Sequence, residues 1–308
     1  MEGTLPDEIF FVLTDLTRLK LSRNSIYGTF PKSLSMLTKL AELDLSENKF
    51  TSTIPHELSR LANLQVFNVA SNHLTGRLPN TLHFLKNMLH FNVSYNLLSG
   101  RALSNELIGT INGNPFAGMG YLESLDLSHC NFGGRIDADS TRNLDSLKEL
   151  YLDHNFFSGQ ITSSSLARFT SLEIFSASHN QLEYSIPREL GQLASLRILD
   201  LSNNLFVGTL PPEISNILSL EELHVNDNMI GGSIPPEFSG LPSLRESEDA
   251  CLLCFGCTLF RCFLLLTCLF VRAINFALRS SHDTAYKINR RCGLPLFVST
   301  CIDELVAI

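Results

Sequence analysis

The apolar positions of this 308-residue chain recur with a fixed spacing. In the clearest instance, LAELDLSEN, three leucines (Leu40, Leu43 and Leu45) precede Asn48 in the pattern L-x-x-L-x-L-x-x-N. Side chains alternate across an extended chain, so the L-x-L part points both leucines to one side and the residue between them to the other. Each segment therefore predicts a short strand with one buried face, and successive segments predict a parallel sheet.

Nine segments carry this pattern, and a polar residue closes each of them. The closing residues are Asn24, Asn48, Asn72, Asn96, Cys130, Asn155, Asn180, Asn204 and Asn228. The steps between them are 24, 24, 24, 34, 25, 25, 24 and 24 residues, a period that indicates a solenoid of stacked coils. Because an Asn amide can pair with backbone groups that the turn would bury, we expect an internal Asn ladder in which Cys130 replaces one Asn.

The segment after each closing residue repeats as well. A glycine and then Ile-Pro or Leu-Pro follow, and apolar residues recur at three-residue steps, as in Leu58, Leu61 and Leu64 after Pro55. This spacing predicts a 3₁₀-like return segment, at the start of which proline fixes φ. Five glycines stand where a tight bend requires positive φ. They are Gly76, Gly100, Gly159, Gly208 and Gly232.

The combined string L-x-x-L-x-L-S-x-N-x-L-x-G-x-I-P resembles the plant-specific leucine-rich repeat of receptor-like kinases, receptor-like proteins and polygalacturonase-inhibiting proteins. The resemblance covers residues 1–244. It implies an α/β solenoid, a right-handed leucine-rich-repeat superhelix with a parallel sheet on its concave face and a 3₁₀ or irregular convex side. It also implies a protein of the plasma membrane or the extracellular space that binds a peptide or protein ligand, or a co-receptor kinase.

Charge and motif content favour a binding protein. Residues 1–244 contain 16 Lys and Arg against 25 Asp and Glu, whereas residues 245–308 contain 7 against 6. An acidic repeat region argues against nucleic acid as a partner. The sequence contains no Gly-rich phosphate loop, no H-E-x-x-H and no kinase motif, so we predict that the protein is not an enzyme and needs no cofactor.

The 34-residue step between Asn96 and Cys130 interrupts the period. Asn105 fits a closing position 25 residues before Cys130, which assigns the excess to the nine residues after Asn96 and predicts an irregular coil at 97–112. An extruded loop, a collapsed repeat and a faulty gene model each explain the excess. The chain also starts within a repeat, and no signal peptide is recognisable at its start, which favours a truncated beginning.

Residues 245–308 do not follow the repeat and form a separate tail. The apolar, Cys-rich run 251–271 is long enough to span a bilayer, and basic residues follow it. Arg261 at the centre of the run argues against a membrane helix, and a translated intron is the alternative interpretation. Cys251, Cys254 and Cys257 have metal-like spacing, but their apolar surroundings are unlike a zinc knuckle, so we predict no metal site.

A second resemblance lies near the end of this tail. The stretch from Cys292 to Cys301 resembles the C-G-x-P-L-x-x-x-C pair in the C-terminal cap of plant receptor-like proteins. The resemblance implies a disulfide between these two cysteines, formed in an oxidising compartment. In those receptors the cap precedes the membrane helix, whereas here it follows the apolar run. The two interpretations of the tail therefore conflict in order.

Candidate ligand-binding residues stand at outward strand positions of three neighbouring repeats, around Tyr151. An aromatic side chain among acidic neighbours suits a hot spot for a basic or aromatic ligand, while a solvated acidic face is the alternative. The candidates are Asp126, His129, Glu149, Tyr151, Asp153, His154, Ser176 and His179.

Three of these candidates, His129, His154 and His179, directly precede closing residues and should stack in consecutive repeats. Such imidazoles would titrate as a coupled set and form a pH-sensitive or anion-binding stripe, unless histidine is only a common filling of this position. One N-glycosylation sequon starts at Asn92, and a glycan there would cover part of the strand face.

The sequence thus favours a ligand- or protein-binding module of a plant cell-surface receptor-like protein in signalling or defence. One alternative is a secreted inhibitor of a pathogen cell-wall hydrolase, similar to polygalacturonase-inhibiting proteins. The other is a gene fragment without a function.

Overall fold

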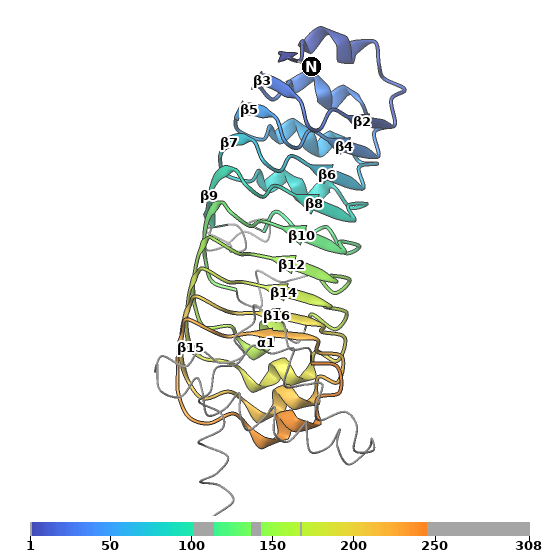
Figure 1. Ribbon diagram of the computed structural model, residues 1–308. Helices are drawn as coiled ribbons and strands as arrows, with labels where there is room; N and C mark the ends of the chain where they lie inside the picture. Colours follow the sequence, from blue (N-terminus) through green and yellow to red (C-terminus); the bar gives the residue numbers. More distant parts are fainter. Residues whose placement is uncertain (1, 102–113, 137–142, 167, 245–308) are drawn as a thin grey trace, which may run out of the picture. The chain divides into compact units, whose positions relative to one another are not determined.

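The computed structural model describes residues 2–101, 114–136, 143–166 and 168–244. The chain divides into two compact units, Met1–Gly256 and Cys257–Ile308, and all described residues lie in the first. The described residues form the predicted solenoid of stacked coils (Figure 1). The apolar run 251–271 and the cysteines Cys292 and Cys301 lie outside the described residues.

Within the described ranges, one parallel sheet of nine strands contains the L-x-L segment of every coil. Its strands are β2 (Arg18–Lys20), β4 (Glu42–Asp44), β6 (Val66–Asn68), β8 (His90–Asn92), β10 (Ser124–Asp126), β12 (Glu149–Tyr151), β14 (Ile174–Ser176), β16 (Ile198–Asp200) and β18 (Glu222–His224). The central residue of each strand pairs with its counterparts in register, as Leu125 does with Phe91 and Leu150. From β4 onward these central residues are buried, so the residues on either side point outward, and we call this outward surface the β-face.

A second parallel sheet, which the sequence did not predict, lies beside the first. Over the described residues it has ten strands: β1 (Glu2–Gly3), β3 (Ser25–Thr29), β5 (Lys49–Ser52), β7 (His73–Gly76), β9 (Leu97–Arg101), β11 (Asn131–Gly134), β13 (Phe156–Gly159), β15 (Gln181–Ser185), β17 (Leu205–Gly208) and β19 (Met229–Ile230). From β3 onward, each strand begins at the residue that follows a closing residue. Buried side chains such as Phe50, Phe132 and Phe206 fill the space behind it.

After each strand of the second sheet the chain bends, and the residue four positions after the closing residue has positive φ in the described coils. The predicted glycines have positive φ, for example 80° at Gly76 and 78° at Gly159. Two coils place Ser52 and Tyr184 at the same position with φ of 80° and 70°. The prediction for the glycines is confirmed, and these two residues adopt a conformation that L side chains disfavour.

The return segments are mostly 3₁₀ helices, as the three-residue spacing predicted. In the described chain they are η1 (Asp7–Phe11), η2 (Lys32–Met36), η3 (His56–Arg60), η4 (Asn80–Phe84), η5 (Arg188–Gln192), η6 (Pro212–Asn216) and η7 (Pro236–Gly240). Proline directly precedes each of them in an extended conformation, with φ of −73° at Pro55. One coil has Thr162 in place of this proline and forms the short helix α1 (Ser163–Leu166) instead, where the Thr162 hydroxyl accepts a hydrogen bond from the Ser165 N–H.

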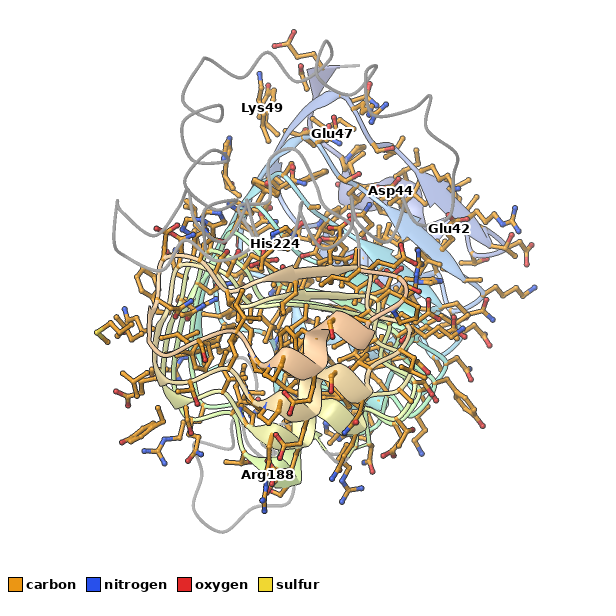
Figure 2. The ribbon with its side chains drawn as sticks, turned by 60° about the horizontal axis from the view of Figure 1, so that its bottom comes forward. Glu42, Asp44, Glu47, Lys49, Arg188 and His224 are labelled. Carbon is orange, nitrogen blue, oxygen red and sulfur yellow. The ribbon has the colours of Figure 1, made fainter. Side chains whose placement is uncertain are left out.

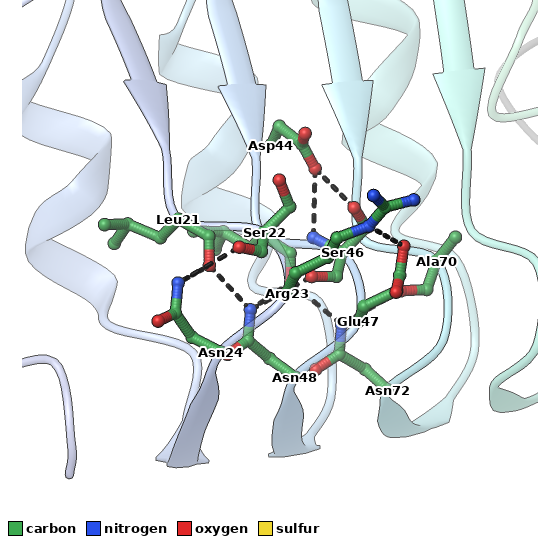
Figure 3. Close-up of polar contacts among 11 residues, drawn as sticks. Leu21, Ser22, Arg23, Asn24, Asp44, Ser46, Glu47, Asn48, Ala70 and Asn72 are labelled. Carbon is green, nitrogen blue, oxygen red and sulfur yellow. Dashed lines mark hydrogen bonds and ion pairs between the residues drawn. The ribbon is translucent and has the colours of Figure 1, made fainter. Parts of the chain in front are cut away.

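The closing residues form the internal ladder, which we call the Asn column. Nδ2 of Asn48 donates to the carbonyl of Leu21 at 2.8 Å (Figure 3). It also donates to the carbonyls of Leu45 at 3.1 Å and Ser46 at 3.0 Å, and Oδ1 accepts from the N–H of Ile26 at 3.0 Å. The same contacts recur at Asn72, Asn96, Asn155, Asn180, Asn204 and Asn228. Each Asn side chain thus joins its own coil to the preceding one.

Cys130 occupies its predicted place in the Asn column and is buried. Its Sγ donates to the carbonyl of Val93 at 3.4 Å, the bond that an Asn amide makes elsewhere to the preceding coil. Burial raises the pKa of this thiol to about 11. The residue is therefore an uncharged thiol at neutral pH and a weaker member of the column.

The long step between Asn96 and Cys130 leaves both sheets intact. Strand β9 (Leu97–Arg101) pairs in parallel with β7 and β11, so five of the nine residues that the sequence assigned to the excess form a regular strand. Met119 N–H donates to the Phe116 carbonyl as Leu85 does to Leu82, which aligns 116 with the return segment of the preceding coil. The additional residues therefore fall within 102–113, outside the described residues.

Candidate ligand-binding site

Three adjacent strands and the turns that follow them carry the eight candidate residues. The register pairs Asp126 with Tyr151 and Tyr151 with Ser176, so β10, β12 and β14 bring them side by side on the β-face. The three histidines lie in the turns that follow these strands. The structure thus brings together every candidate that the sequence selected.

In five of the nine described β-face strands, the outward residue that ends the strand caps the turn that follows. Oδ1 of Asp126 accepts from the N–H and hydroxyl of Ser128 at 3.0 and 2.7 Å. Asp44, Asn68, Asn92 and Asp200 make the corresponding bond to the N–H two residues later. Asp126 therefore has a local structural role. The recurrent Asp or Asn two residues before Ser or Ala was a signal in the sequence for this cap.

Asp153 supplies the same kind of cap to the turn of the following coil. Its coil and the next have Tyr151 and Ser176 at the cap position, and neither offers a carboxylate or an amide there. Oδ1 of Asp153 instead accepts from Ser178 N–H at 2.8 Å and from the hydroxyls of Ser178 at 3.0 Å and Ser176 at 2.5 Å. The carboxylate thus substitutes for the cap missing from the following coil.

Tyr151 is half-buried between these polar groups. Burial raises its pKa, and the negative charges of Glu149, Asp126 and Asp153 raise it further. The phenol therefore remains a neutral hydrogen-bond donor beside an acidic surface. Glu149 accepts a hydrogen bond from the Ser124 hydroxyl at 2.9 Å on the neighbouring strand.

The residue before each closing residue has left-handed backbone in every described coil. Its φ lies between 50° and 57°, and we call these nine positions the turn column. They are Arg23, Glu47, Ser71, Tyr95, His129, His154, His179, Asn203 and Asp227. None of them is glycine, although five are His, Asn or Asp, the other residue types enriched in this conformation. At the candidate site, the backbone N–H of each turn-column residue donates to a carbonyl of the following coil, as the N–H of His154 does to the Ser178 carbonyl at 3.0 Å.

Four members of the turn column stack as aromatic rings. The ring centroids of Tyr95 and His129 are 4.0 Å apart, those of His129 and His154 4.1 Å, and those of His154 and His179 4.0 Å. The interplanar angles are 12°, 20° and 13°. We call this set the aromatic stack.

The aromatic stack favours a neutral imidazole at His154. Burial lowers the pKa of His154, and His129 and His179 lower it further, whereas the carboxylates of Asp153 and Asp200 act in the opposite direction. Nearly parallel rings also direct their nitrogen lone pairs side by side and not toward one ion. Among the described residues, no group of three His, Cys, Asp or Glu is arranged to hold a metal.

The charges of the candidate site differ from those of the first two coils. There Glu42 pairs with Lys20 at 2.7 Å and with Arg18 at 3.7 Å, and Arg23 pairs with Glu47 at 2.9 Å. The outward positions of β10, β12 and β14 carry no Lys or Arg. Figure 2 shows Glu42 on the side of the β-face strands and Arg188 on the side of the 3₁₀ helices.

Asn92 ends β8, next to the candidate site. Its Oδ1 accepts from the N–H and hydroxyl of Ser94 at 2.9 and 2.8 Å, which occupies the amide oxygen and not the nitrogen to which a glycan attaches. Glycosylation of this half-buried side chain remains a prediction.

Comparison with known families identifies the repeats. A leucine rich repeat model matches residues 3–50, 14–74 and 145–206, and a second one matches 121–144 and 219–241. Together the matched segments cover more than half of the chain. The chain belongs to the leucine-rich-repeat family. Its repeats are of the plant extracellular type, and the predicted fold class is confirmed.

Solved structures similar to this leucine-rich-repeat protein include plant receptors. The plant peptide hormone receptor RGFR1, in complex with RGF2, shares 30% identity over 79% of this chain and 44% of its own, with a TM-score of 0.51. A TDR receptor shares 27% identity over the same shares, with a TM-score of 0.65. A leucine-rich-repeat protein from Leptospira interrogans shares 26% over 79% of this chain and 62% of its own, with a TM-score of 0.57.

This leucine-rich-repeat protein spans less than half the length of the two receptors. A comparison with curated proteins finds no match. In the part of the chain that the structure describes, no helix combines the length and hydrophobicity needed to cross a bilayer.

Proposed function

We propose that the protein binds a peptide or protein ligand on the β-face of β10, β12 and β14, as the ligand-binding module of a plant cell-surface receptor-like protein in signalling or defence. The observation that carries the proposal is Tyr151. It replaces the regular cap residue with a half-buried aromatic side chain, among carboxylates and without a Lys or Arg at neighbouring outward positions. The similarity to a plant peptide hormone receptor supports this ligand class.

The physical basis is a rigid surface. The Asn column and the leucine core hold the strands at fixed spacing, so the outward side chains are presented at a low cost in ordering entropy. Tyrosine adds a large contact area and a hydrogen-bond donor, which makes it a frequent hot spot in interfaces. The carboxylate of Glu149 favours a basic or aromatic group of the ligand beside the phenol.

The test compares Tyr151→Ala with Tyr121→Ala. Tyr121 is exposed and occupies the repeat position of Lys39, outside the β-face, so it is a matched control. The probes are a panel of synthetic plant peptide hormones and a purified fungal polygalacturonase, measured by calorimetry. For the bound probe we expect Tyr151→Ala to cost about 2 kcal/mol or more, roughly 30-fold in Kd, and Tyr121→Ala little.

Further controls are Lys39→Ala and Arg60→Ala, which change charge on the return side of the coils. Equal losses from these variants and from Tyr151→Ala would contradict the assignment to the β-face. Binding and inhibition of the polygalacturonase, without binding of any peptide, would favour the alternative function of a secreted hydrolase inhibitor. Absence of binding to every probe leaves neither function supported and favours the gene fragment.

A further inference from the structure

The aromatic stack spans four consecutive coils at the turn-column position, where the repeat pattern specifies no residue type. Each ring stands on a left-handed residue whose N–H donates to the next coil, as in His129 to the Asp153 carbonyl at 2.8 Å and His154 to the Ser178 carbonyl at 3.0 Å. The backbone therefore fixes the separation of the rings near 4 Å. Neutral rings stack favourably at such a separation, whereas two charged imidazoles repel.

Among the described residues, the titratable groups that act on His154 lie in two directions. Along the column they are His129 and His179, and on the β-face they are the carboxylates of Asp153 and Asp200. On the second sheet the residues that follow the closing positions of these three coils are Asn131, Phe156 and Gln181, which carry no charge. Of the two carboxylates, Asp153 is held by hydrogen bonds to Ser176 and Ser178, and Asp200 by hydrogen bonds to Ser202.

We propose that the aromatic stack, Tyr95, His129, His154 and His179, is a pH-sensitive clasp. With neutral imidazoles the rings hold four coils together, and protonation separates the rings and loosens the contacts between these coils. The proposal rests on the stack itself and not on the proposed ligand-binding function.

The direction of the pH effect follows from the folded-state pKa of His154, which lies below its ordinary value of 6.5. The unfolded chain takes up the proton first as the pH falls. The stabilising contribution is therefore complete above about pH 6.5, the ordinary value for an unfolded chain, and is lost as the pH falls to the folded-state pKa. Mild acidification, and not alkali, opens the clasp.

The first measurement is an NMR titration of the imidazole resonances in the full chain. We expect a His154 midpoint below 6.5. In the double variant His129→Phe/His179→Phe the rings remain stacked but cannot be charged, so the midpoint of His154 should rise part of the way back, since burial still lowers it. A midpoint at 6.5 in the unmodified protein, or one that the double variant leaves unchanged, would overturn the proposal.

The second measurement is the melting temperature at pH 7.5 and pH 5.0. His154→Phe keeps a ring in the stack and removes its charge, and the matched control is His73→Phe, an exposed histidine outside the stack. Titrating carboxylates affect all three proteins alike. Between pH 7.5 and pH 5.0 the melting temperature of the unmodified chain should fall, and that of His154→Phe should fall by about 2 to 4 °C less. Equal losses in His154→Phe, His73→Phe and the unmodified protein would contradict the clasp.

Discussion

The Asn column and the turn column are adjacent in sequence, yet the side chains of one are mostly buried and nearly uniform, whereas those of the other are at least partly exposed and varied. The Asn column is buried for most of its length, and one residue type with a single Cys satisfies its hydrogen bonds. The turn column has the same backbone conformation in all nine described coils but carries seven residue types, most of them at least partly exposed. Of two consecutive positions in each repeat, one thus stabilises the stack of coils and the other varies on the surface.

The difference has a simple physical origin. In the Asn column the side chain supplies the hydrogen bonds, so its chemistry is fixed by buried backbone groups that need partners. In the turn column the backbone N–H supplies the bond to the next coil, so the side chain is free to vary. Left-handed backbone costs energy for residues other than glycine, and the bonds between coils compensate for it.

The largest effect should come from the Asn column, through Asn155→Ala. The amide of Asn155 donates to the carbonyls of Leu127, Leu152 and Asp153 and accepts from the N–H of Phe132. Its removal leaves several buried backbone groups without partners, at about 1 to 3 kcal/mol each. We expect the free energy of unfolding in urea to fall by about 3 kcal/mol or more.

The control for this prediction is Asn131→Ala, which removes an exposed amide one residue after the Asn column. Its effect should stay within about 0.5 kcal/mol. If the two variants unfold at the same urea concentration, the buried ladder is not the main tie between coils.

A smaller effect is expected at Asp153, which belongs to neither column and caps the following coil. Asp153→Ser removes the acceptor for Ser178 N–H and for two hydroxyls, and should cost about 2 kcal/mol in the free energy of unfolding. Ser176→Asp introduces the ordinary cap that Asp126 and Asp200 provide in their own coils. The double variant should therefore recover most of the loss, by urea denaturation.

The rescue distinguishes a cap from a ligand-binding charge. If Ser176→Asp fails to restore stability, Asp153 does not act as the cap of the next coil. Loss of ligand binding in Asp153→Ser alone would be ambiguous because the turn beneath the site changes. Tyr151→Ala, which disturbs no such bond, remains the cleaner probe of the proposed function.

Periodicity explains what could be predicted from the sequence. The strands around Leu43 and Leu150, the Asn column and the 3₁₀ segments after proline repeat often enough for the pattern to identify them. The second sheet was missed because its short strands, such as Phe156–Gly159, end in glycine and resemble a bend. The turn column was missed because no single residue type recurs along all of it, and only the backbone conformation is shared.

The candidate site was predicted in part for the same reason. Outward positions follow from the strand pattern, so Tyr151 and its neighbours were placed correctly on one surface. The role of Asp153 was not predicted, since its bonds cross to another coil where Ser176 breaks the local cap pattern. The placement of the excess residues also failed, because the spacing of Asn105 imitates a closing position while β9 continues regularly through Arg101.

The smallest effect should come from the one exception within the Asn column. The thiol of Cys130 donates at 3.4 Å to the Val93 carbonyl, where an Asn amide donates to the preceding coil and to its own coil and also accepts an N–H from the preceding coil. Cys130→Asn should therefore raise the free energy of unfolding by about 1 kcal/mol, and Asn96→Cys should lower it by at least as much, both measured in urea. Because burial raises the thiol pKa to about 11, Cys130 should also resist iodoacetamide at pH 7 until the protein unfolds. Rapid labelling of the native protein, or a loss of stability in Cys130→Asn, would show that this position is not a weakened copy of its neighbours.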